Sequence, residues 1–178
     1  SSDVCSSDLT AYVELVEAQK RLIKAGGSVE PEITITVATK NPGNADYAPE
    51  IVTNAAGENL LLGVYPASSG YSLESYFNIT GGSVTFSYDS IATGSKVQVL
   101  DSSNKVVYEF VIVVSGDVTG AGNPSASDAS TLSRAASGYM SFSESMDSAF
   151  DYAADLDGSG NISGTDASAL SRAVSGYG

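Results

Sequence analysis

A stretch of 23 residues occurs twice near the C-terminus, and this duplication is the strongest constraint on the fold. Residues 117–139 and 155–177 align without gaps at an offset of 38 positions, and fifteen of the 23 aligned positions are identical. A repeat of this kind indicates two copies of one supersecondary unit that pack against each other. We therefore expect the C-terminal third of the chain to be built from two equivalent halves.

The second copy begins with a loop that is rich in oxygen ligands. Asp155, Asp157, Ser159 and Asp166 stand at loop positions 1, 3, 5 and 12, a glycine stands at position 6, and Asn161 offers its backbone carbonyl at position 7. This is the spacing with which a calcium loop surrounds its ion. The chain has no histidine for a softer metal. We predict a calcium site at these five residues; the alternative is a polar turn in which Asp166 only caps a helix.

The first copy retains only part of this ligand set. Asp117 and Asp128 stand at positions 1 and 12 and Asn123 at position 7, but position 3 is Thr119 and position 5 is Ala121. Calcium affinity falls as charged ligands are lost. Two interpretations stay open: a weaker calcium site formed by Asp117, Thr119, Asn123 and Asp128, or a loop that has lost its ion.

Each loop is followed by a short helix, predicted over 128–137 and 166–175 and ended by a glycine. A tandem repeat of loop and helix with aspartate at position 12, close to the C-terminus, resembles the dockerin domain of cellulosome-type assemblies. The resemblance covers residues 115–178. It implies a domain that folds around calcium and binds a cohesin domain on a scaffold or cell-surface protein.

The resemblance also implies a partner surface. Dockerins contact their cohesin through residues on the two helices and just before them. The alternative for these positions is a solvated helix surface, and the two leucines among them face either the core or the partner. The equivalent positions here are Ala126, Ser127, Leu132, Arg134, Gly164, Thr165, Leu170 and Arg172.

Residues 59–114 are predicted to form a small, mostly antiparallel β-module. It contains four runs of alternating or β-branched residues bounded by glycines and polar turns. The turn 101–104 joins the last two runs into a predicted hairpin, and 71–77 is predicted as a short helix. The module resembles those that precede dockerins in surface and cellulosomal proteins of gut Firmicutes. The four runs are 60–65, 83–88, 96–100 and 106–114.

The chain before this module is of mixed character. Residues 28–58 are interpreted as a strand at 33–37 followed by linker. Residues 10–27 place apolar side chains at helical spacing and end in two glycines, which predicts an amphipathic helix. We expect this helix to belong to an upstream module that is truncated; docking onto the β-module is the other interpretation. Residues 1–9 resemble a translated sequencing adapter and are expected to be a non-native leader, with a natural linker as the alternative.

Composition excludes several classes of function. The net charge of −13 repels nucleic acid and anionic membrane surfaces. No stretch approaches the roughly 20 apolar residues that a membrane span requires. Without histidine, a His-based catalytic triad cannot form, and the acidic residues outside the loops stand in no recognisable catalytic context. We expect no enzymatic activity from this chain.

The sequence thus predicts a multi-domain protein with an N-terminal amphipathic helix, a small mostly-β module and an all-α dockerin of two EF-hand-like calcium loop–helix repeats. We expect a secreted bacterial fragment that binds a cohesin and anchors a missing carbohydrate-active or adhesive module to a cell-surface complex for polysaccharide degradation. The alternative is a calcium-stabilised extracellular adhesion or carbohydrate-binding module, for which exposed tyrosines would serve as stacking platforms. These tyrosines are Tyr65, Tyr71, Tyr76 and Tyr88.

Overall fold

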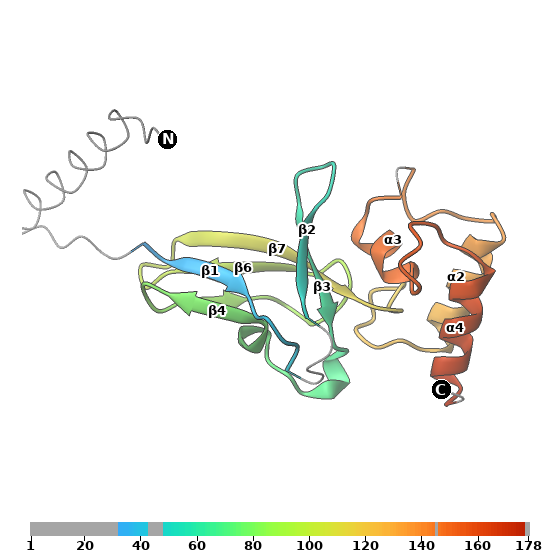
Figure 1. The fold of residues 1–178 in the computed structure, drawn as a ribbon, viewed down its shortest axis with the longest axis horizontal. Helices are drawn as coiled ribbons and strands as arrows, with labels where there is room; N and C mark the ends of the chain where they lie inside the picture. The colour runs from blue at the N-terminus through green and yellow to red at the C-terminus, as the bar shows by residue number, and fades with distance from the viewer. Residues whose placement is uncertain (1–31, 43–47, 145, 177–178) are drawn as a thin grey trace, which may run out of the picture. The chain divides into compact units, whose positions relative to one another are not determined.

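The computed structural model describes residues 32–42, 48–144 and 146–176 (Figure 1). It divides into two compact units, Ser1–Glu32 and Ile33–Gly178, and the second contains every strand and helix described below. The predicted leader 1–9 and helix 10–27 lie outside the described residues. The domain boundaries placed after residues 58 and 114 stay predictions.

A five-stranded sheet lies at the centre of the second unit. Neighbouring strands are antiparallel, except that β3 and β7 are parallel. The β6–β7 hairpin confirms the pairing predicted around the 101–104 turn, where Asp101 Oδ1 accepts hydrogen bonds from the N–H groups of Ser103 and Lys105. The strand order is β2 (Glu50–Thr53), β3 (Asn59–Val64), β7 (Val106–Val114), β6 (Lys96–Leu100) and β5 (Thr85–Ser87).

Strand β7 occupies the middle of the sheet because its second half is apolar on both faces. Side chains alternate between the two faces of a strand. Val111 and Val113 therefore face one core, whereas Phe110, Ile112 and Val114 face another, and all five are buried. The first core also contains residues of the C-terminal helices, and the second contains residues of a smaller sheet.

The smaller sheet has two antiparallel strands, β1 (Thr34–Val37) and β4 (Phe77–Thr80). Two 3-10 helices, η1 (Ala67–Ser69) and η2 (Leu73–Tyr76), lie in the connection between β3 and β4. The short helix predicted at 71–77 is therefore a 3-10 helix. It carries Tyr76 into the second core, where the phenol oxygen accepts a hydrogen bond from the N–H of Tyr65 at 3.0 Å.

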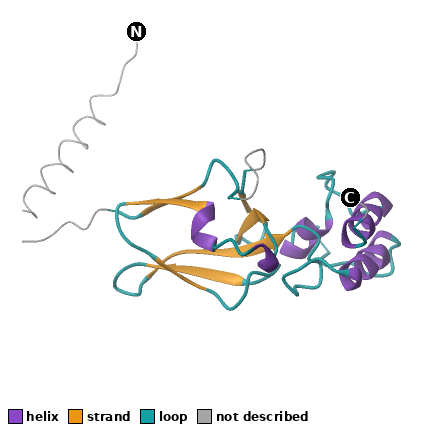
Figure 2. Cartoon of the chain, turned by 90° about the horizontal axis from the view of Figure 1, so that it is seen from below, coloured by secondary structure: helices purple, strands orange, loops and turns teal. Residues whose placement is uncertain are grey.

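Three α-helices follow the sheet in the described part of the chain (Figure 2). Each begins with a serine followed three residues later by an aspartate, whose Oδ2 accepts hydrogen bonds from the serine N–H and hydroxyl. This reciprocal capping box provides partners for N–H groups of the first turn. The helices are α2 (Ala126–Ala136), α3 (Ala149–Ala154) and α4 (Gly164–Val174). Because the serine is the cap, α2 and α4 start two residues before the predicted 128 and 166.

The predicted multi-domain class with an all-α C-terminal domain of two EF-hand-like repeats is wrong. A sheet-rich region over residues 34–114 is followed by three described helices in one compact unit. Helices α2 and α4 pack against each other, whereas α3 packs on β7. The core that they share includes Leu60, Val111 and Val113 of the sheet. The helices themselves bury mostly alanines and two leucines, and these residues share their core with the sheet.

The interpretation of 28–58 was also incomplete. The predicted strand at 33–37 is β1, but the segment taken for linker contains β2 as well. Strand β2 pairs with β3 and forms one edge of the large sheet. Its position brings Glu50 towards the loop that precedes α4, as described next.

Candidate metal centre

Three carboxylates come together in the loop that precedes α4. Carboxylate oxygens of Asp155, Asp157 and Asp166 all lie within 4.8 Å of one another. Oxygens bound to one calcium ion are at most about 5 Å apart, which is twice the usual calcium–oxygen distance of roughly 2.4 Å. The spacing therefore fits one calcium ion, and a donor set made of oxygen alone fits a hard cation.

Asp166 is the most firmly held of the three. It is fully buried; its Oδ1 accepts hydrogen bonds from the N–H groups of Leu156 (2.9 Å) and Asp157 (3.2 Å), and its Oδ2 accepts the N–H and the hydroxyl of Ser163, both at 2.8 Å. Burial raises the pKa of Asp166, but the hydrogen bonds from Ser163, Asp157 and Leu156 together lower that pKa below its ordinary value of 3.8. The carboxylate is therefore ionised at neutral pH.

Asp155 and Asp157 are held by backbone groups of their own loop. Oδ1 and Oδ2 of Asp155 accept the N–H groups of Ser159 (3.0 Å) and Gly160 (2.7 Å), and Oδ1 of Asp157 also accepts the N–H of Ser159 at 3.0 Å. The turn requires positive φ at Gly158 (69°) and Gly160 (80°), which glycine adopts without steric cost. Asp157 is exposed, so its carboxylate is accessible from solvent.

The two other predicted ligands lie in the same turn. The hydroxyl of Ser159 donates to the backbone carbonyl of Asn161 at 3.2 Å. This contact places the two uncharged oxygens next to each other, on a loop whose backbone already contacts Asp155 and Asp157. The assignment of Ser159 and Asn161 as calcium ligands stays a prediction.

The first loop has a different arrangement. Asp117 and Asp128 are fully buried, and Asp117 Oδ1 accepts the N–H of Ala121 at 2.8 Å. Thr119 donates its N–H (2.9 Å) and its hydroxyl (2.7 Å) to Oδ1 of Asp128. Position 3 thus supplies a hydrogen-bond donor where the second loop has an acid. Asn123 accepts the N–H of Ser68 with its side-chain Oδ1 at 3.1 Å.

The lowered pKa of Asp128 follows from these contacts. Burial raises the pKa of this carboxyl, but the hydrogen bonds from Ser125 and Thr119 outweigh burial and lower the pKa below 3.8. Asp128 and Asp166 are therefore electrostatically alike, although only Asp166 lies in a group of three acidic side chains within the described residues.

Helices α2 and α4 form two equivalent grooves along their contact. Shifting every lining residue of one groove by 38 positions gives the lining of the other, so the face has approximate two-fold symmetry. Each groove contains one arginine, Arg172 in the groove of about 490 Å³ and Arg134 in the groove of about 460 Å³. The first groove is lined by Ser133, Ala136, Ser137, Gly164, Ala167, Ser168, Ser171 and Arg172.

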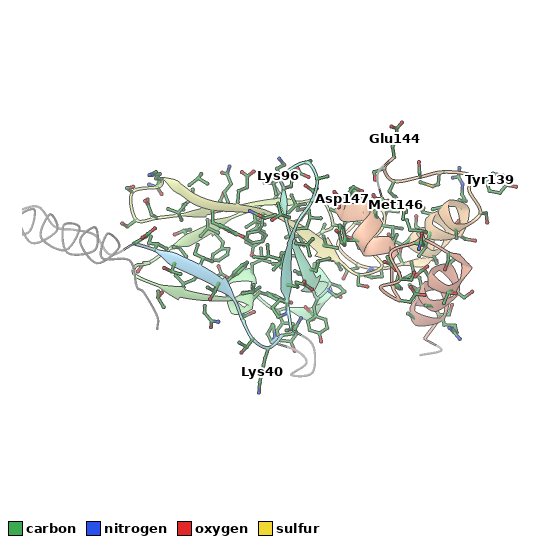
Figure 3. The ribbon with its side chains drawn as sticks, turned by 45° about the horizontal axis from the view of Figure 1, so that its top comes forward. Lys40, Lys96, Tyr139, Glu144, Met146 and Asp147 are labelled. Atoms are coloured by element: carbon green, nitrogen blue, oxygen red, sulfur yellow. The ribbon has the colours of Figure 1, made fainter. Side chains whose placement is uncertain are left out.

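The predicted partner residues divide into two groups by exposure. Leu132 and Leu170 lie in the first core, with 0% and 2% of their surface exposed. Tyr139 was not among the predicted partner residues. It follows α2, is 81% exposed and points away from the helices (Figure 3). The other six predicted residues are exposed on or beside the two helices: Ala126, Ser127, Arg134, Gly164, Thr165 and Arg172.

Glu50 lies near the second loop, which its sequence position does not indicate. It lines a cleft of about 490 Å³ together with Tyr152, Asp155 and Asp157. Burial raises the pKa of Tyr152, and the charges of Asp147 and Glu50 raise it further. No local sequence signal identifies Glu50, because only the pairing of β2 with β3 brings this strand to the loop.

Comparison with protein families matches residues 115–175 to the dockerin type I domain. The C-terminal third of the chain therefore carries a dockerin domain, which confirms the family resemblance, and the sheet before it is consistent with a preceding β-module. Comparison with curated proteins and with solved structures gives no match. Dockerin domains are non-catalytic modules that bind cohesin domains, and type I dockerins generally bind calcium. Among the described residues, no helix is both long and apolar enough to cross a membrane.

Proposed function

We propose that this chain is a non-catalytic anchoring fragment that depends on one calcium ion. Asp155, Asp157 and Asp166, with Ser159 and Asn161, hold the ion, and the face formed by α2 and α4 binds a cohesin domain. The observation that carries the proposal is the group of three carboxylates inside the segment that matches the dockerin family.

Calcium stabilises the second loop by neutralising charge. Three ionised carboxylates within one loop repel one another, and the net charge of −13 adds to the repulsion. Asp166 belongs both to this group and to the capping box at the start of α4. Calcium binding is thereby linked to the helix that forms half of the partner face.

The α2–α4 face suits a partner that can bind in two orientations. Its two grooves have equivalent linings, each with one exposed arginine. Arginine offers several donors in a planar arrangement that suits carboxylates and carbonyl groups of a partner. A cohesin surface that fits Arg134 and its groove therefore also fits Arg172 and its groove after a half-turn.

Such a module has its role in a larger assembly. We place the chain outside the bacterial cell, in a surface complex for polysaccharide degradation, where it anchors an upstream carbohydrate-active or adhesive module. The partner is a cohesin on a scaffold or cell-surface protein. Recovery of the complete reading frame tests this context, because an upstream segment without an enzymatic or adhesive domain would contradict it.

Calorimetric titration of the full chain with calcium tests the metal site. Asp157→Asn removes one charge from an exposed ligand whose hydrogen bond to Ser159 an amide oxygen can keep. We expect calcium affinity to fall roughly tenfold or more, because affinity follows the number of charged ligands. Asp89→Asn, at an exposed aspartate outside the loop, is the control with the same change in net charge. Equal affinities for Asp157→Asn and the unaltered chain would refute the site.

A carbohydrate-binding module is the second candidate function. The rings of Tyr65 and Tyr71 lie 5.6 Å apart, and Tyr71 is 38% exposed. Paired tyrosines combine an apolar face with a polar end and suit sugar rings. Affinity electrophoresis in gels that contain soluble plant polysaccharides tests this function. If Tyr71→Ala migrates like the unaltered chain in every polysaccharide, the carbohydrate-binding function is rejected.

A further inference from the structure

The first loop is closed by hydrogen-bond donors of the protein itself. Both oxygens of Asp117 are engaged: Oδ1 accepts the N–H of Ala121, and Oδ2 accepts the N–H groups of Gly122 (3.0 Å) and Thr93 (2.9 Å). Both oxygens of Asp128 are engaged as well, by Thr119 and Ser125. Buried carboxylates need such partners, and the protein supplies them to both aspartates of this loop.

One of these donors comes from the sheet region. Thr93 lies between β5 and β6, and its hydroxyl accepts the N–H of Val114 and donates to the carbonyl of Val114, both at 3.1 Å. The same residue therefore joins the end of β7 and the carboxylate at position 1 of the first loop. Thr93 and Asp117 are both buried, so water does not compete for these hydrogen bonds.

Further contacts hold the other side of the loop. The N–H of Ala67 donates to the carbonyl of Gly122 at 3.1 Å, and the N–H of Ser68 donates to the side chain of Asn123 at 3.1 Å. Both donors lie in η1, between β3 and β4. The first loop thus contacts two segments of the sheet region. We call these segments, residues 67–68 and 91–93, the docking segments.

The glycines of the two loops show how close this approach is. A Cβ atom at Gly122 would lie 2.8 Å from the carbonyl oxygen of Ile91, and one at Gly120 would lie 3.1 Å from that of Thr93. The equivalent Gly160 and Gly158 have nothing within 4 Å of such an atom. The φ angles agree between Gly122 and Gly160 (87° and 80°) and between Gly120 and Gly158 (72° and 69°). The two loops therefore have the same turn, but only the glycines of the first loop lie against other segments of the chain.

We propose that the docking segments take the place of a cation at the first loop. The backbone N–H of Thr93, from a docking segment, and the hydroxyl of Thr119, from the loop itself, stabilise by hydrogen bonding the carboxylates that an ion would otherwise bind, so this loop folds without metal. The sheet region and the C-terminal helices consequently unfold as one cooperative unit, and residues 67–68 and 91–93 are a required part of the folded C-terminal segment. The proposal concerns the first loop and does not depend on the calcium site of the second.

The glycine pairs provide a matched test in the full chain. Gly122→Ala is compared with Gly160→Ala, and Gly120→Ala with Gly158→Ala, in EDTA. All four variants place a side chain at positive φ, so this strain cancels within a pair. We expect each first-loop variant to lower the thermal midpoint by about 3 °C or more beyond its second-loop counterpart, since only the first loop meets the docking segments. Failure of Gly122→Ala to fold while Gly160→Ala folds would agree with this expectation.

Two results would overturn the proposal. Equal shifts within both pairs would mean that the docking segments do not support the loop. Separate melting transitions for the helical and sheet signals in the unaltered chain would mean that the two regions are not one unit.

Counting bound ions in the unaltered chain separates this proposal from the calcium site. Equilibrium dialysis should find one calcium ion per chain, unchanged by Asp117→Asn. Two ions, one of them lost in Asp117→Asn, would refute the metal-free first loop and leave the second-loop site intact. No bound ion would refute the second-loop site and agree with a metal-free first loop.

Discussion

Replacing Asp166 by asparagine separates the structural role of this residue from its role as a calcium ligand. Its carboxylate accepts four hydrogen bonds, three from backbone N–H groups and one from the Ser163 hydroxyl. Asparagine offers only one accepting oxygen. In its better orientation that oxygen faces Leu156 and Asp157, the amide group faces Ser163, and the N–H of Ser163 loses its partner.

The N–H of Ser163 is partly buried. A buried donor without a partner costs about 1–3 kcal/mol, so we expect Asp166→Asn to destabilise the folded chain by about 2 kcal/mol. For a unit of this size that corresponds to a decrease of roughly 6 °C in the thermal midpoint. Asp157→Asn should change stability by less than about 0.5 kcal/mol, because the residue is exposed and keeps an accepting oxygen for Ser159. These values apply in EDTA, where no ion contributes.

Urea unfolding in EDTA and again in calcium measures both roles. Calcium at 100 times its dissociation constant stabilises a folded protein by about 2.7 kcal/mol, and both variants should lose most of that increment. Asp128→Asn is the control, because Asp128 also accepts four hydrogen bonds in the first loop, two from backbone N–H groups and two from hydroxyls. It should cost as much in EDTA and retain the calcium increment. If Asp157→Asn destabilises the apo chain as much as Asp166→Asn does, the reasoning is wrong.

Two further predictions follow from the charges and the symmetry. Because the pKa values of Asp128 and Asp166 are lowered from 3.8, their contribution to stability is present above pH 3.8 and is lost as the pH falls through the lower folded values; thermal midpoints in EDTA should drop steeply below pH 4, and less steeply in Asp128→Asn. If both grooves can bind the cohesin, Arg134→Ala or Arg172→Ala alone should weaken cohesin binding by about RT ln 2, or 0.4 kcal/mol, whereas the double variant should lose far more than the sum; in calorimetry, abolition by one single variant would show that one groove carries the interface.

Sequence reasoning works well where the signal is local. Strands β6 and β7 have the predicted bounds, because β6 alternates valine with polar residues, β7 is rich in β-branched and aromatic residues, and a polar turn separates them. The three carboxylates of the second loop lie together as their spacing predicts. The helices start two residues before the predicted 128 and 166, because Ser125 and Ser163 are the caps and the aspartates complete capping boxes.

Sequence reasoning fails where the structure depends on contacts between distant segments. Strand β2 lies among turn residues and gains its conformation from pairing with β3. The docking of the first loop depends on the backbone N–H of Thr93, and a backbone donor has no sequence signature. The all-α prediction followed from the repeat alone, whereas Leu60, Val111 and Val113 show that the sheet supplies part of the helical core.

The differences between the two copies lead to a last prediction. In the loops, Val118, Thr119, Ala121 and Pro124 of the first copy replace a leucine, an aspartate, a serine and an isoleucine, while both loops keep their glycines and their turn. Protein donors hold the carboxylates of both loops, but only the second loop gathers three carboxylates, which we propose bind calcium, and the helices behind the loops line equivalent grooves. Removal of calcium should therefore loosen the first turn of α4 and spare that of α2. Hydrogen exchange in EDTA should show faster exchange at Ala167 than at Ala129, with the two alike in calcium. Equal acceleration at both amides would show that the two loops depend on the ion to the same degree.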